Sequence, residues 1–104
     1  MSEYERVIAS LLSRQGFLVF QTIGSEPVDL IAIINGIALL VEVKEKESIS
    51  VRPSQEKYQR DLARRYGCLY VVIKGDQATV YTNTGYFKVD IELLAESLKK
   101  YHLV

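Results

Sequence analysis

Residues 27–46 read PVDLIAIINGIALLVEVKEK, in which the Asn35-Gly36 dipeptide separates two apolar runs. Asn-Gly in this setting predicts a β-hairpin with a two-residue type I′ turn, because both turn positions require a positive φ. With this dipeptide as the loop, the numbers of directly opposed residues sum to 71. The runs 28–34 and 37–43 are apolar on both faces along their middle. We therefore expect the hairpin to lie centrally in a sheet that is covered on both faces.

The same register places Asp29 opposite Glu42. Directly opposed Cβ atoms of an antiparallel pair are about 4.5–5.5 Å apart, so two carboxylates there repel each other. Lys44 lies two residues beyond Glu42 and therefore projects from the same face. Two acids and a lysine at the end of an apolar hairpin indicate a divalent-metal site that acts on phosphodiesters. The alternative is a pair of solvated strand-end charges, with Lys44 in an ordinary salt bridge.

The composition is that of a small globular protein. The 104 residues, 48% apolar and 25% charged, predict one domain over residues 1–104. We expect neither a membrane span nor a secretory signal, because no apolar run reaches about 18 residues and the first residues lack a basic and then apolar stretch. The single cysteine, Cys68, cannot form an internal disulfide, which favours a reducing cytoplasm.

The formal net charge is zero, but the charges are unevenly divided. Residues 1–50 carry four Lys or Arg against seven Asp or Glu, whereas residues 51–104 carry nine against six. A bound cation would offset the acidic half, and the basic half could contact phosphate.

Apolar periodicity and turn residues predict the remaining elements. Helices are expected at 2–14, at 53–66 and after Asp90 as N-cap; further strands are expected at 17–22, 69–74 and 78–82, and turns at 75–76 and 83–85. The predicted order of elements is αβββαββα.

The order Pro27-Val28-Asp29 … Glu42-Val43-Lys44 resembles the PD-(D/E)XK nuclease superfamily. The likeness is closest to the archaeal Holliday junction resolvases and covers roughly residues 2–66. Further features of the likeness are Glu5-Arg6 on the first helix, Gly16-Phe17 before the first strand, Gly24-Ser25 in a loop, Asp29-Leu30-Ile31-Ala32 as a strand, and Gln55 and Gln59 on the helix after Glu-x-Lys.

This resemblance implies a restriction-endonuclease-like α/β fold, with a central mixed β-sheet flanked by helices. It implies an endonuclease that hydrolyses structured DNA with Mg²⁺ or Mn²⁺ and acts as a homodimer, because resolving a junction needs two cuts. Exposed tyrosines and the last amphipathic helix could supply the dimer face. One alternative is a nuclease of the same fold that acts on damaged, flap or single-stranded DNA. The other is a non-catalytic nucleic-acid-binding subunit that retains the fold.

The expected metal ligands are Asp29, Glu42 and the main-chain carbonyl of Val43, since Mg²⁺ takes oxygen ligands. Lys44 would position the attacking water and stabilise charge on the phosphate, because two neighbouring carboxylates favour its charged form. Proton abstraction by Lys44 is an alternative. Glu5 matches an acid that assists the metal site in the resolvases, but Ser2-x-x-Glu5 is also a capping box.

The candidate nucleic-acid-binding residues lie in a loop and on the second helix: Ser25, Arg52, Gln55, Lys57, Arg60 and Arg64. Lys57, Arg60 and Arg64 form one helical stripe that could follow a phosphate backbone. The alternatives are turn chemistry for Ser25 and a solvated helix face for the others.

Overall fold

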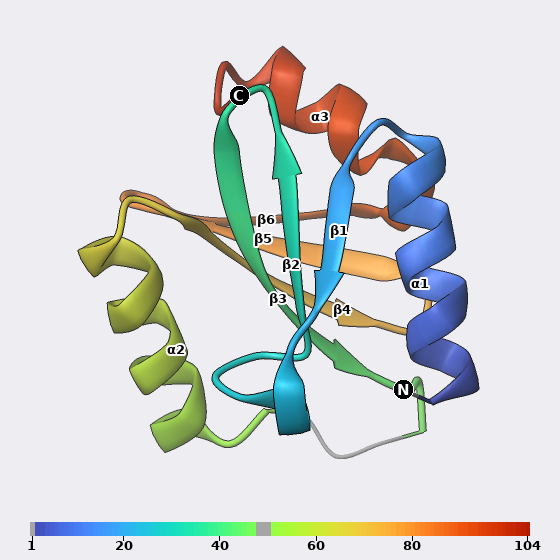
Figure 1. Cartoon of the computed structure of the whole chain (residues 1–104). Helices are drawn as coiled ribbons and strands as arrows, with labels where there is room; N and C mark the ends of the chain where they lie inside the picture. Colours follow the sequence, from blue (N-terminus) through green and yellow to red (C-terminus); the bar gives the residue numbers. More distant parts are fainter. Residues whose placement is uncertain (1, 48–50) are drawn as a thin grey trace.

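The computed structural model describes residues 2–47 and 51–104 (Figure 1). Its elements are α1 (Glu3–Arg14), β1 (Leu18–Gln21), the 3-10 turn η1 (Ile23–Ser25), β2 (Leu30–Ile34), β3 (Ile37–Lys44), α2 (Pro53–Arg65), β4 (Leu69–Lys74), β5 (Gln77–Thr82), β6 (Gly85–Asp90), the 3-10 turn η2 (Ile91–Leu93) and α3 (Leu94–Lys100). No helix in this described part of the chain has the length and apolarity needed to cross a membrane.

The strands form one six-stranded sheet in the order β1-β2-β3-β4-β5-β6. Strands β3 and β4 pair in parallel, and every other neighbouring pair is antiparallel. A parallel pair needs a crossover connection, and α2 supplies it between β3 and β4. The predicted mixed α/β sheet is confirmed.

The hairpin of β2 and β3 has the predicted register. Asn35 and Gly36 have φ values of 49° and 78°, as a type I′ turn requires. Ile34 lies opposite Ile37, and Leu30 lies opposite Val41, so opposed numbers sum to 71 throughout the ladder. The turn alone therefore decides which residues of the two strands face each other.

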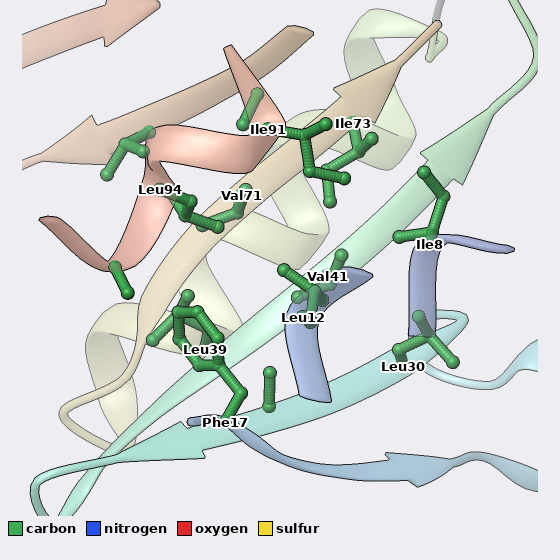
Figure 2. Close-up of a cluster of buried hydrophobic side chains, with 14 of the residues drawn as sticks. Ile8, Leu12, Phe17, Leu30, Leu39, Val41, Val71, Ile73, Ile91 and Leu94 are labelled. Carbon is green, nitrogen blue, oxygen red and sulfur yellow. The ribbon is translucent and has the colours of Figure 1, made fainter. Parts of the chain in front are cut away.

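Helices cover both faces of the sheet, and β3 is buried between them. On one face, α1 and α3 pack over a large apolar cluster drawn in Figure 2, which includes Leu12, Val41 and Leu94. On the other face, α2 packs through Ala63 onto a smaller cluster with Leu40 and Tyr70. Figure 1 shows α2 on the side of the sheet opposite α1. Residues that share a face with Leu40 therefore point toward α2.

The predicted order of elements omits one strand, β6, and is wrong at that point. The observed order is αβββαβββα, with Thr82 paired to Gly85 across a turn at 83–84. Phe87 and Val89 pack against the large cluster, while Tyr86 and Lys88 are exposed, so the segment alternates as a strand should. Asp90 does cap the segment after it, because its side chain accepts from the Glu92 N–H at 2.9 Å.

We predict that Gly36→Ala lowers the free energy of unfolding by about 1–2 kcal/mol, because an L-residue with a side chain is strained in the left-handed region. Urea denaturation measures this loss. Asn35→Gly is the matched control: glycine accepts the positive φ, so its effect should be smaller. Equal losses in the two variants would contradict the turn assignment.

Candidate active site

Asp29 and Glu42 lie on the α2 face of the sheet, at the open end of the hairpin. Asp29 directly precedes β2, and Glu42 lies near the end of β3. Their side chains follow the alternation that also turns Ile31 and Leu40 toward α2. The two acids are only 9% and 4% exposed. Both carboxylates are therefore largely removed from water.

Three neighbours contact this carboxylate pair. The main-chain N–H of Val43 donates to Asp29 Oδ2 at 2.8 Å. Lys44 Nζ lies 3.6 Å from Glu42 Oε2. Gln55 Nε2 donates to the same oxygen at 3.4 Å. The structure thus brings together five of the residues expected in the site from the sequence: Asp29, Glu42, Val43, Lys44 and Gln55.

The position of Glu42 makes its ionisation unfavourable. Burial, followed by the adjacent Asp29 carboxylate, raises the pKa of Glu42 from 4.5 to about 7, although the Lys44 ammonium opposes the shift. Two acids this close hold their charges poorly without a cation between them. A divalent ion would neutralise both carboxylates.

The oxygen atoms here fit a hard divalent cation. Within residues 2–47 and 51–104, no three His, Cys, Asp or Glu side chains gather into a metal site. The side-chain donors are therefore the two carboxylates, a number that suits Mg²⁺ because this ion keeps several waters. An extended residue directs its N–H and C=O to the same side, and the Val43 N–H points at Asp29. The Val43 carbonyl is accordingly the available third oxygen.

A buried hydrogen-bonded chain fixes the segment that leads into Asp29. Gln59 of α2 is 1% exposed, and its Nε2 donates to the Pro27 carbonyl at 3.0 Å. Its Oε1 accepts a hydrogen bond from the Tyr70 hydroxyl on β4. Burial, followed by the charge of Glu42, raises the pKa of Tyr70, so this hydroxyl stays a donor. The chain ties α2, β4 and the loop before Asp29 together.

Sequence reasoning noted Gln59 loosely and missed Tyr70. The alternation in Leu69–Lys74 was the available signal, because it puts Tyr70, Val72 and Lys74 on one face. The contact itself also depends on how β4 lies against α2.

Glu5, Ser25 and Arg52 make no hydrogen bond or ion pair with Asp29 or Glu42 among the described residues. Glu5 closes the capping box of α1, since its Oε2 accepts from Ser2 N at 3.2 Å and its N–H donates to Ser2 Oγ at 3.1 Å. Ser25 in η1 and Arg52 at the start of α2 are exposed. The roles of all three residues in the site stay predictions.

The basic stripe on α2 is partly neutralised. Lys57 Nζ lies 2.7 Å from Asp61 Oδ2, and Arg60 lies 3.5 Å from Glu56 Oε1. Arg60 also stacks over the Tyr81 ring at 4.8 Å from its centre. Arg64 is exposed. Arg60 therefore faces the sheet, whereas Lys57 is held in a surface pair.

The chain matches the family model described as archaeal Holliday junction resolvase (Hjc) over residues 2–103. Among solved structures, it is similar to Hjc of Archaeoglobus fulgidus, a Holliday junction resolvase from an archaeal hyperthermophile. The TM-score is 0.68 and the identity 21%, over 96% of this chain and 99% of that one. A VRR_NUC domain gives a TM-score of 0.54 at 17% identity, over 95% and 92% of the two chains. No curated protein sequence matches significantly. The predicted family resemblance and fold class are confirmed.

We predict that the wild-type protein without divalent cations loses stability between pH 5 and pH 8 and that Glu42→Gln does not share this loss. The stabilisation from protonated Glu42 is complete below pH 4.5 and disappears as the pH rises through about 7. Glutamine mimics the protonated carboxyl at every pH. Urea denaturation in EDTA should show a difference of up to roughly 3 kcal/mol at pH 8. Parallel pH profiles for the two proteins would contradict the raised pKa of Glu42.

Proposed function

The chain belongs to the archaeal Holliday junction resolvase family, a family of DNA recombination and repair, and is a resolvase-like nuclease; we propose that residues 1–104 form one nuclease-fold domain that cuts four-way DNA junctions with Mg²⁺ or Mn²⁺ at Asp29 and Glu42. We infer that it works in the cytoplasm. The observation that carries the proposal is the pair of neighbouring buried carboxylates, with Lys44 Nζ 3.6 Å from Glu42.

The carboxylate pair favours an enzyme over a binding-only subunit. Burying two like charges together costs stability, and a surface that only binds DNA gains nothing from them. Lys44 alone could contact a phosphate, but Asp29 and Glu42 would repel it. An acidic pocket on a DNA-directed protein makes sense when a cation occupies it during the reaction.

In this proposal, Asp29, Glu42 and the Val43 carbonyl hold the cation. When bound, it supplies Lewis-acid polarisation of the scissile phosphate and lowers the pKa of water. The Lys44 ammonium donates to the attacking water or to a phosphate oxygen and stabilises the charge that develops there. Gln55 and the Val43 N–H keep Glu42 and Asp29 in place. The resemblance further implies 5′-phosphate and 3′-hydroxyl products.

We propose that the chain acts as a homodimer through the α2-side surface of strand β1. The apolar side of the last helix is not available for this contact, because Leu94 and Leu98 of α3 are fully buried in the core. The exposed apolar residues lie elsewhere: Leu18 and Phe20 on edge strand β1 are 57% and 50% exposed, and Ile23 is 95% exposed. Phe20 pairs with Ile31 and Leu18 with Ile33, so the Leu18 and Phe20 side chains share the α2 side of the sheet.

We predict that Glu42→Gln abolishes cleavage of four-way junctions in Mg²⁺ while the fold is retained, because it removes one of two carboxylate ligands. Cleavage is assayed on labelled four-way, flap, damaged, linear and single-stranded DNA. The matched control is Glu47→Gln, an exposed acid beyond Lys44, which should cleave like the wild type.

Cleavage of junctions by Glu42→Gln would show that Glu42 is not a required metal ligand. Equal cleavage of all substrates would contradict junction specificity and would support the alternative of a nuclease of the same fold with a broader range of DNA substrates. Binding of junctions without cleavage under any divalent cation would favour the non-catalytic subunit.

We predict that Phe20→Glu converts the dimer to a monomer, because a charge would be buried in an apolar interface. Sedimentation equilibrium measures the change in mass. Leu93→Glu is the control, since Leu93 is also 50% exposed but lies in η2, away from β1. A wild-type monomer, or a Phe20→Glu dimer, would contradict this interface.

A further inference from the structure

Beside the carboxylate pair, the α2 face of the sheet carries a groove of about 620 Å³. Its floor is formed by side chains at alternate positions of β4, β5 and β6, namely Val72, Lys74, Gln77, Thr79, Tyr81, Tyr86 and Lys88. Arg60 and Glu56 of α2 line one side, and Lys44 and Lys46 lie at the end nearest the site. The groove therefore continues directly from the candidate active site, since Lys44 belongs to both.

The groove is basic. Five of its lining residues are cationic, from Lys44 to Lys88, and two are acidic. One of the acids, Glu56, is already paired with Arg60 at 3.5 Å. The excess of positive charge favours a phosphate-bearing occupant.

A row of tyrosine rings runs from the buried Tyr70 to Tyr81 and Tyr86 in the floor of the groove. The ring centres of Tyr70 and Tyr81 are 5.3 Å apart, and those of Tyr81 and Tyr86 are 5.8 Å apart. Tyr86, at the outer end, is 64% exposed, and the Arg60 guanidinium lies over the Tyr81 ring. A row of rings that ends in an exposed ring provides a surface on which a further planar group can stack.

We propose that this groove binds unpaired nucleotides of the DNA strand next to the scissile phosphate, with a base stacked on Tyr86 and phosphates near Lys88 and Lys46. Aromatic rings within a basic groove suit single strands, because each unpaired base exposes a face for stacking. An intact duplex keeps its base faces stacked inside and offers the groove only phosphates. The inference rests on the proposed nuclease function and names the form of DNA that the site accepts.

The binding test separates stacking from charge. Fluorescence anisotropy in EDTA, where no cleavage occurs, compares a labelled thymidine strand of roughly 12 nucleotides with an abasic strand of the same length and charge. The wild-type protein should bind the thymidine strand about tenfold more tightly. Tyr86→Leu should lose this preference for bases, and Tyr86→Phe should keep it because the ring remains. Tyr58→Leu is the control: Tyr58 is 57% exposed on α2 but does not line the groove.

Lys88→Gln tests the phosphate contacts. It should weaken binding of the thymidine and abasic strands equally and lower the salt dependence of log Kd by about 1. A strand-selective effect of this variant would contradict the placement of phosphate beside Lys88.

Three results would overturn the proposal: equal binding of the thymidine and abasic strands by the wild type, retained base preference in Tyr86→Leu, or binding of duplex alone. None of these depends on turnover. If the protein did not cleave junctions in Mg²⁺, the proposed nuclease function would be contradicted. The comparison of thymidine-strand and abasic-strand binding would still test the groove.

Discussion

Repulsion between two buried carboxylates is the constraint around which this structure is arranged. The open end of the hairpin brings Asp29 and Glu42 close together, and burial removes the water that would screen their charges. The neighbouring groups all act on this repulsion. The Val43 N–H and Gln55 donate to the acids, and Lys44 supplies a positive charge. A cation bound between the two carboxylates, as in the proposed function, would remove this repulsion.

Helix α2 owes its position to polar contacts as much as to apolar ones. Gln59, at the centre of its inner face, is more fully buried than Ala63, and links Pro27 to Tyr70. Such an arrangement is specific, because a shift of the helix would leave a buried amide without partners. The same contacts hold the loop before Asp29 and place Gln55 over Glu42. Helix α2 therefore holds the site in place through polar contacts, although few of its apolar side chains are buried.

The local parts of this fold were predictable and the non-local parts were not. Asn35-Gly36 determines the turn, the turn determines the register, and the register determines that Asp29 meets Glu42, all within one short stretch. Strand β6 was missed because the inner residues of Gly85–Asp90 find their partners only once β5 is in place. The Gln59–Tyr70 contact and the groove depend on the parallel pairing of β3 with β4, which no local pattern specifies. Glu5 shows the converse: a local capping contact accounts for it without any reference to the site.

The parallel seam between β3 and β4 also explains the uneven charge along the chain. Strand β3 is the last strand of the acidic first half, and α2 and β4 are the first elements of the basic second half. The two halves therefore meet where β3 pairs with β4. Glu42 lies beside Val72 and Lys44 beside Lys74 in this register. An acidic pocket that suits a cation therefore adjoins a basic surface that suits phosphate, on one face of one sheet. The net charge of zero does not reveal this arrangement. The acidic pocket and the basic surface become distinct, adjacent regions only when the chain folds.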